Sequence, residues 1–211
     1  NSLSWKIEEP KSIGLLGVNG SGKTTLLRLL AGMLRPNHGY VKINDIMIKN
    51  MKFTKKIIGY LPENAKLFLT GPTFRNDLEK ILGDQEKVKK LQQRYELDSL
   101  IDKRLYQLSE GQRRLLAIIG CFQISRQLLL FDEPTIGLDY SGRKLFLSLI
   151  KQATKEGKTI IVSTNDIRIL PQLDHLIVLK DGIIAMEGPP REILYRLELE
   201  TELIPNQIVR V

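Results

Sequence analysis

The chain has 211 residues, of which 42% are hydrophobic and 27% are charged. This length suits one domain with a sizeable core and leaves no room for a second full domain. The single cysteine, Cys121, excludes an internal disulfide and a multi-cysteine metal cage. We expect a soluble chain, because its apolar runs are shorter than the ~20 residues of a membrane helix and no signal-peptide pattern opens it.

The balance of charge favours anionic partners. Thirty-two Lys and Arg against 24 Asp and Glu leave a formal charge of +8, which suits nucleotide phosphates, nucleic acid or an acidic membrane surface. The basic residues are scattered, and no aromatic residues alternate with them as in a platform for single-stranded nucleic acid. We therefore expect no nucleic-acid partner and interpret most of these residues as a solvated face.

Short apolar runs alternate with helical stretches, which predicts an α/β fold with a central, mostly parallel sheet and flanking helices. Residues 12–16, 128–131 and 159–164 are nearly all apolar and are predicted as central strands, because such strands are covered on both faces. A further core-facing strand is predicted where apolar side chains alternate near the start of the chain, at Leu3, Trp5 and Ile7.

Two more runs are predicted as an antiparallel β part that flanks the core rather than forming it. They are residues 40–44 and residues 176–180. The second run turns through Asp181-Gly182 into residues 183–186, a pattern typical of a hairpin.

Helical patterns dominate two other regions. Residues 69–108 contain no strand candidate, and the charged stretches at 79–82 and 86–97 have helical spacing, which predicts a helical insertion. The tail is helix-like from residue 191 to about residue 203, where Ile204-Pro205 is expected to end it.

A glycine-rich loop joins the strand at 12–16 to a predicted helix at 26–33. Its sequence, Gly17-Val-Asn-Gly20-Ser-Gly22-Lys23-Thr24-Thr25, is typical of a loop that turns its backbone N–H groups around phosphates. We expect Lys23 to reach the β and γ phosphates, Thr24 to hold Mg²⁺ and Thr25 to touch the α phosphate. A glycine-rich turn that merely enters a helix does not account for the full match. The predicted nucleotide-binding residues here are Asn19, Gly20, Ser21, Gly22, Lys23, Thr24 and Thr25.

Two carboxylates follow the predicted strand at 128–131. Asp132 and Glu133 would be costly at the end of a buried strand unless a cation and a polar ligand met them. We expect Asp132 to hold Mg²⁺ through water and Glu133 to orient or deprotonate an attacking water. Capping of the loop at Pro134 would explain one of the two acids but not both.

The segment Leu108-Ser-Glu-Gly-Gln-Arg113 precedes an apolar helical run to Phe122. Ser109 and Gln112 have the spacing of a capping box, so the segment is a predicted helix start. An exposed helix start with Ser and Gly is also an anion site, and both readings stay open on these residues alone.

Together, the phosphate loop, Leu108-Ser-Glu-Gly-Gln112 and Asp132-Glu133-Pro134 followed by Gly137-Leu-Asp139 resemble the motif set of the ATP-binding cassette (ABC) ATPases. The resemblance covers nearly the whole chain. It implies a single nucleotide-binding domain over 1–211, with an ATPase core at 1–68 and 109–211 and the helical insertion at 69–108. In that family two such domains pair head to tail around ATP. Ser109, Gly111 and Gln112 would then serve the partner's nucleotide, and Asp139 would lie in the loop that links the two sites.

Three residues depart from the family pattern. Glu63 stands where a glutamine usually senses Mg²⁺ and the transmembrane partner, and its carboxylate would still meet Mg²⁺. Asn165 replaces the histidine that contacts the γ phosphate, so it donates a hydrogen bond there but carries no charge. Glu110 replaces a glycine, and neither His38 nor His175 is expected to substitute for the missing histidine. The family's adenine-stacking aromatic would lie upstream of Ser2.

Within the family, residues 59–64, 67–68, 111–120 and 203–205 resemble the energy-coupling-factor and cobalt-type importers, which often pair two different ATPases. The leading hypothesis is therefore an ATP-hydrolysing subunit at the cytoplasmic face of a membrane, bound to transmembrane transporter subunits and importing a vitamin or a metal ion. The alternatives are the ATPase of an efflux pump, a non-transport protein acting on DNA, ribosomes or iron–sulfur assembly, and a regulatory subunit with weak hydrolysis. Asn165 favours the regulatory subunit. The presence of Lys23, Asp132 and Glu133 opposes it.

Overall fold

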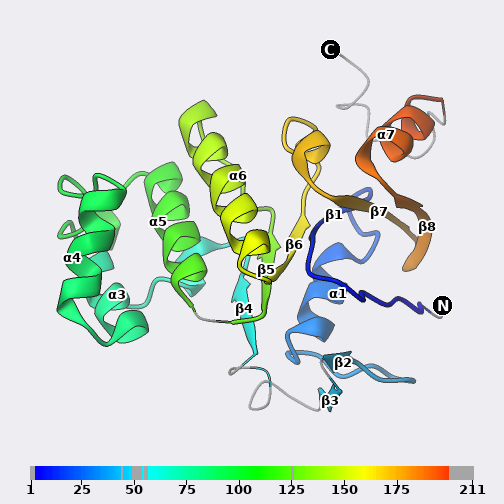
Figure 1. Cartoon of the computed structure of the whole chain (residues 1–211), viewed down its shortest axis with the longest axis horizontal. Coiled ribbons are helices and arrows are strands. Elements are labelled where there is room, and N and C mark those ends of the chain that lie inside the picture. Colours follow the sequence, from blue (N-terminus) through cyan, green and yellow to red (C-terminus); the bar gives the residue numbers. More distant parts are fainter. Residues whose placement is uncertain (1–2, 44, 49–53, 55–56, 125, 200–211) are drawn as a thin grey trace.

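The structure, a computed structural model, describes residues 3–43, 45–48, 54, 57–124 and 126–199. Within these residues the main sheet has six strands in the order β4-β5-β6-β1-β7-β8 (Figure 1). Their bounds are β1 Ser12–Leu16, β4 Ile58–Leu61, β5 Leu128–Asp132, β6 Thr159–Ser163, β7 His175–Lys180 and β8 Ile183–Gly188.

The first five strands in that order are parallel, and only β8 pairs antiparallel. The predicted α/β fold with a mostly parallel central sheet is confirmed. The strand predicted at 12–16 has these bounds, and those predicted at 128–131 and 159–164 are correct to within one residue.

The prediction that residues 176–180 flank the core rather than forming it is wrong. β7 pairs in parallel with β1 and contributes to the core, since residues 176–179 are all buried. The predicted hairpin into β8 is confirmed, with positive φ at Asp181 and Gly182. β4, which is not among the predicted strands, pairs with β5 along Ile58–Leu61.

A second, two-stranded sheet contains β2 (Lys42–Ile43) and β3 (Ile46–Met47), which pair antiparallel as predicted for 40–44, although Asn44 lies outside the described residues. The strand predicted around Trp5 is wrong, because residues 3–11 form no strand, although the Lys11 carbonyl oxygen accepts a backbone hydrogen bond from Ile160 N–H of β6 at 3.0 Å. Trp5 is nevertheless half-buried and packs on the core, as its neighbours Leu3 and Ile7 do. The alternation of apolar residues therefore predicts correctly which side chains pack on the core, although the segment does not form a strand.

The alternating side chains of the parallel strands build two core layers. Leu129 and Phe131 of β5 face the layer beneath α5 (Glu110–Gln123) and α6 (Tyr140–Lys155), where the Phe131 ring lies 5.3 Å from that of Phe146. Leu128 and Leu130 face α1 (Lys23–Leu30) on the other side of the sheet. Both faces are thus covered, which explains the nearly all-apolar strand sequences.

Helices also occupy the region between β4 and α5. Residues 69–108, all described, contain α3 (Phe74–Leu82) and α4 (Gln85–Arg94), which lie beyond α5 at the left of Figure 1. The side chains of Thr73 and Asp84 cap the two helix starts. α3 begins earlier and α4 ends earlier than predicted, and the assignment of 69–108 as an insertion stays a prediction. Short 3-10 helices occur at Ala65–Leu67, Leu105–Gln107 and Leu170–Gln172.

The chain's last described element is α7 (Pro190–Leu199), which packs on β7 and β8. The predicted end of the tail helix, near residue 203, and the stop at Ile204-Pro205 lie outside the described residues. No helix of the described part is both long and apolar enough to cross a membrane.

Candidate functional site

The glycine-rich loop connects β1 to α1, as its sequence predicts. Gly17 requires glycine, because a Cβ there would lie 2.4 Å from the carbonyl oxygen of Leu179. Gly22 caps α1 in the left-handed conformation at φ 104°. The loop therefore bends tightly enough to place the start of α1, with its free N–H groups, at the mouth of a cleft.

Lys23 lies inside this loop. Its ammonium donates a hydrogen bond of 2.6 Å to the carbonyl oxygen of Gly17, and the side chain is buried. Burial lowers the pKa of Lys23, whereas the nearby carboxylates of Glu133 and Asp132 raise it. The loop also contains the Ser21 hydroxyl, which is buried without a partner among the described residues. The loop therefore contains the ammonium of Lys23 and the Ser21 hydroxyl, which has no partner among the described residues.

Asp132 ends β5 with a carboxylate that is 1% exposed. Three hydroxyls surround it: the Thr24 hydroxyl lies 3.1 Å and the Ser163 hydroxyl 2.7 Å from Oδ1, and the Tyr60 hydroxyl lies 3.5 Å from Oδ2. Thr24 and Asp132, two of the three predicted Mg²⁺ ligands, are thus brought together from positions 108 residues apart. Their oxygens are the type of ligand that Mg²⁺ prefers.

Ser163 and Tyr60 are not among the predicted site residues. Ser163 is the last residue of a strand neighbouring β5, and a polar residue at that end of a parallel strand is a signal that could have identified it. No such signal marks Tyr60, because the residues of β4 are not predicted as a strand from the sequence.

Glu133 follows directly and adopts φ +47°, a left-handed conformation that non-glycine residues seldom take. Its backbone N–H donates to the carbonyl oxygen of Ser163 at 2.9 Å. Burial raises the pKa of the Glu133 carboxyl, and the nearby Asp132 raises it further, while Lys23 lowers it. The net increase brings the carboxylate closer to the pKa of a useful proton acceptor at neutral pH.

Lys23, Thr24, Glu133 and Ser163 line one cleft of about 910 Å³, and the buried Asp132 is bonded to Thr24 and Ser163 of this lining. Asn19, Gly20, Gly22, Thr25 and Glu63 line it as well, and Glu63 is exposed at its rim. Asn165 also lines the cleft, with its side-chain oxygen buried and without a partner among the described residues. Lining residues that are not among the predicted ones are Thr135, Ile136, Gly137, Leu138, Arg143, Ser163, Asp166 and Arg168.

The predicted helix start at Ser109 is an N-cap of α5. Its hydroxyl accepts from the backbone N–H of Gln112 at 3.1 Å, and the Gln112 side chain accepts from the Ser109 N–H at 3.0 Å. Ser109 is exposed, and neither it nor Gly111 or Gln112 lines the cleft. The structure therefore does not bring these three residues to the chain's own phosphate loop.

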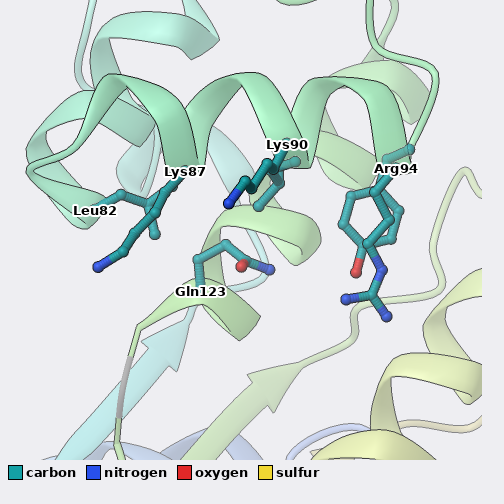
Figure 2. Close-up of a pocket in the computed structure, with 7 residues that line it drawn as sticks. Leu82, Lys87, Lys90, Arg94 and Gln123 are labelled. Carbon is teal, nitrogen blue, oxygen red and sulfur yellow. The ribbon is translucent and has the colours of Figure 1, made fainter.

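A second cavity of about 230 Å³ lies between α4 and the end of α5. Figure 2 shows the side chains of Lys87, Lys90 and Arg94 extending from α4 on the side of the helix where Gln123 lies. The Arg94 guanidinium lies over the ring of Tyr95, 5.4 Å from its centre. Among the described residues, no carboxylate and none of the predicted site residues lines this cavity.

Comparison with known proteins identifies the family. The family model described as ABC transporter matches residues 1–136. The energy-coupling factor transporter ATP-binding protein EcfA2 of Clostridioides difficile is 34% identical over 209 residues, covering 92% of this chain and 73% of that protein.

Two solved structures share the fold. A post-hydrolysis dimer of the ATP-binding cassette MJ0796, bound to ADP and phosphate, has a TM-score of 0.80 at 25% identity, over 90% of this chain and 89% of that one. CbiO1 from Clostridium perfringens, described as part of the ABC transporter complex CbiONQ, has a TM-score of 0.76 at 27% identity, over 94% and 84%. The chain therefore belongs to the ABC transporter family, as one of its ATPase subunits.

Proposed function

We propose that this subunit binds ATP with Mg²⁺ in the cleft beside the phosphate loop and hydrolyses it to drive an importer of the energy-coupling-factor type, with a vitamin or a metal ion as cargo. One observation carries the ATPase part of the proposal. Lys23, Thr24 and Glu133 line a single cleft, and the buried Asp132 carboxylate is bonded to Thr24 of that lining, although the chain separates the two pairs widely.

The residues present fit a nucleotide with Mg²⁺. The start of α1 offers N–H donors to phosphate oxygens, Lys23 adds a fixed cation, and the Ser21 hydroxyl, unpartnered among the described residues, lies buried in the same loop. Thr24 and Asp132 would hold Mg²⁺, with Glu63 as a further carboxylate at the rim. When bound, Mg²⁺ supplies charge that neutralises the phosphates during phosphoryl transfer.

Glu133 would accept the proton of the attacking water, because its carboxylate is half-buried beside Asp132 and has a raised pKa. Asn165 would face the γ phosphate and donate one hydrogen bond through its amide. An amide carries no positive charge, so we expect slow turnover by this subunit alone.

A second ATPase subunit, identical or not, would complete the working site. The capped start of α5 is exposed, and Ser109, Gly111 and Gln112 do not line the chain's own cleft, so we expect them to contact the partner's nucleotide in a head-to-tail pair. The dimeric form of the similar cassette MJ0796 supports this arrangement. In this proposal residues 1–211 form one cassette, in which 69–108 is the helical insertion between the core segments 1–68 and 109–211.

Transmembrane subunits would bind the pair at the cytoplasmic face of the membrane and select the cargo. The names of two similar proteins support this part: EcfA2 is an energy-coupling factor transporter ATP-binding protein, and CbiO1 is part of the ABC transporter complex CbiONQ.

A second candidate is a regulatory subunit with little hydrolysis of its own. Asn165 favours it, since the side chain lacks the charge of the family's histidine. The complete set of Lys23, Asp132 and Glu133 favours the hydrolysing subunit instead.

Purification of the tagged chain from membranes, followed by identification of the membrane proteins bound to it, tests the transport assignment. We expect the isolated complex to hydrolyse ATP, Glu133→Gln to slow turnover ~10²-fold or more at unchanged ATP affinity, and Glu187→Gln on exposed β8 to leave it unchanged. A complex in which Glu133→Gln is as fast as the wild type would identify the regulatory subunit. Absence of any bound membrane protein would contradict the transport assignment.

A further inference from the structure

Arg114 is one of two basic side chains that are buried within the described part of the chain. The other, Lys23, belongs to the phosphate loop, whereas Arg114 lies on α5 and is 3% exposed. A buried cation is costly unless it meets carboxylates and hydrogen-bond acceptors, so its surroundings indicate what it does.

The guanidinium of Arg114 points toward the catalytic side of the molecule. Its Nη1 donates to the backbone carbonyl of Glu133 at 3.4 Å, and its Nε is buried without a partner among the described residues. Burial lowers the pKa of Arg114, and four carboxylates act against that effect. In decreasing order they belong to Glu110, Glu63, Glu133 and Asp132.

Two of these carboxylates are departures from the family pattern. Glu110 lies one turn before Arg114 on α5, a spacing that favours attraction between an acid and a following base. Glu63 lies in the loop after β4. The carboxylates at both of these positions therefore act on the same buried cation, Arg114.

The backbone that Arg114 contacts is strained. Glu133 holds φ +47°, and a non-glycine residue keeps such a conformation only where its surroundings enforce it. Its N–H is bound to Ser163, and its carbonyl accepts from Ile136 N–H at 3.4 Å as well as from Arg114. Among these three contacts with the Glu133 backbone, the one from Arg114 comes from a helix, α5.

α5 also touches the loop after Glu133 at a second point. A Cβ on Gly111 would lie 2.6 Å from the carbonyl oxygen of Gly137, so the two backbones pack with no space for a side chain. The exposed start of α5 and the loop that carries Glu133 are thus joined by Arg114 and by this close contact.

We propose that Arg114 is a positioning residue: its guanidinium holds the Glu133 backbone, and with it the carboxylate, in a fixed relation to the start of α5. The inference rests on the proposed function, because it takes Glu133 as the proton acceptor. A displacement of the α5 start by a second subunit then reaches the Glu133 backbone directly through Arg114, whereas the Gly111 contact meets the same loop four residues later.

Steady-state hydrolysis by Arg114→Met tests the inference, because methionine fills the space without charge or donor. We expect kcat to fall about tenfold or more while KM and the Kd for ATP change less than about twofold. Arg114→Lys is expected to restore part of kcat. Arg113→Met, the same loss of charge at a partly exposed neighbour on α5, is expected to keep the wild-type rate within about twofold.

A double-mutant cycle separates positioning from a merely structural role. If Arg114 acts through Glu133, Arg114→Met in the Glu133→Gln background lowers the residual single-turnover rate by less than about twofold. A wild-type kcat in Arg114→Met, an equal loss in Arg113→Met, or a full additional loss in the double variant would overturn the inference. If Arg114→Met does not fold, Arg114→Gln replaces it, and a wild-type kcat there is equally decisive.

Glu133→Gln measured alone keeps the two proposals apart. If it turns over at the wild-type rate, the proposed role of Glu133 fails and this inference fails with it. If Glu133→Gln stops turnover while Arg114→Met is as fast as the wild type, only the inference is wrong.

Discussion

At the scale of single residues, the site depends on how one buried carboxylate is compensated. Asp132 is 1% exposed and is surrounded by the hydroxyls of Thr24, Ser163 and Tyr60. Hydroxyls reduce the cost of burying the charge without neutralising it, so the carboxylate keeps its affinity for a cation. The same carboxylate acts on Lys23 of the phosphate loop, where it opposes the effect of burial on the pKa of that lysine.

Replacing Lys23 by Ala is expected to weaken ATP binding, because the phosphates lose their principal cation. A charged hydrogen bond contributes about 1.5–3 kcal/mol, so the Kd for ATP should rise about 10- to 100-fold. Titration calorimetry measures this change, with Lys180→Ala at the exposed end of β7 as the matched control. An unchanged Kd in Lys23→Ala would remove the phosphate-loop assignment.

Asn165→His is expected to raise the turnover of the isolated chain. Histidine donates a hydrogen bond as asparagine does and adds a proton that it carries or transfers near neutral pH. Because charge near the γ phosphate is a large part of catalysis, the increase should be about 10- to 100-fold at saturating ATP. A histidine variant no faster than an already rapid wild type would show that another group has this role.

At the scale of elements, α5 has two chemically different ends. Its start is exposed and capped by Ser109, and its middle is buried against β4 and α6. The end near Gln123 lies at the cavity under α4 (Figure 2). The exposed start is the part of α5 that a second subunit would contact. The buried middle would pass on any movement of that start.

Ser109→Arg is expected to prevent assembly with a second cassette and to leave ATP binding by the monomer within about twofold, because Ser109 does not line the chain's own cleft. Size-exclusion chromatography with ATP in the Glu133→Gln background measures assembly. Ser109→Ala is the control, since it loses only the cap, at a cost of about 1 kcal/mol. Assembly that Ser109→Arg does not disturb would place the interface elsewhere.

Phe146→Ala is expected to destabilise the chain by about 3–5 kcal/mol. The ring is fully buried on α6 and contacts Phe131 and Phe122 between the helices and the sheet. Denaturant unfolding measures the change, and Tyr195→Ala, with a ring 62% exposed on α7, should alter stability by less than about 0.5 kcal/mol. Equal effects of the two variants would show that the aromatic cluster is not a structural centre.

At the scale of the whole molecule, the site exists because parallel strands end at one edge of the sheet. β1 leads into the phosphate loop, β5 into Asp132 and Glu133, and β6 into Asn165. The order β5-β6-β1 makes these three ends neighbours, so residues far apart in sequence form one cleft at the carboxyl ends of the strands.

Dimerisation is expected to depend on ATP, since in the proposed head-to-tail pair the nucleotide would join the phosphate loop of one cassette to the α5 start of the other. Light scattering of the Glu133→Gln variant should report a monomer without nucleotide and a dimer with ATP. Lys23→Ala in that background should stay monomeric. A dimer that is stable without nucleotide would contradict the head-to-tail arrangement.

The sequence by itself determined the features that depend on neighbouring residues. The loop from Gly17 to Thr25, the capping box at Ser109 and the hairpin turn at Asp181-Gly182 follow from local spacing and from the conformations that glycine permits. Binary patterning likewise predicted strands β1, β5 and β6, because burial on both faces leaves an apolar run.

Only the tertiary structure decided which strands become neighbours. β7 joins β1 in parallel and β4 joins β5, and both pairings depend on long-range hydrogen bonds that no local pattern specifies. The hydroxyl of Tyr60 beside Asp132 follows from the second pairing. The burial of Arg114 against Glu133 likewise depends on how α5 packs on the sheet, because a charged residue in a helix sequence does not reveal what will cover it.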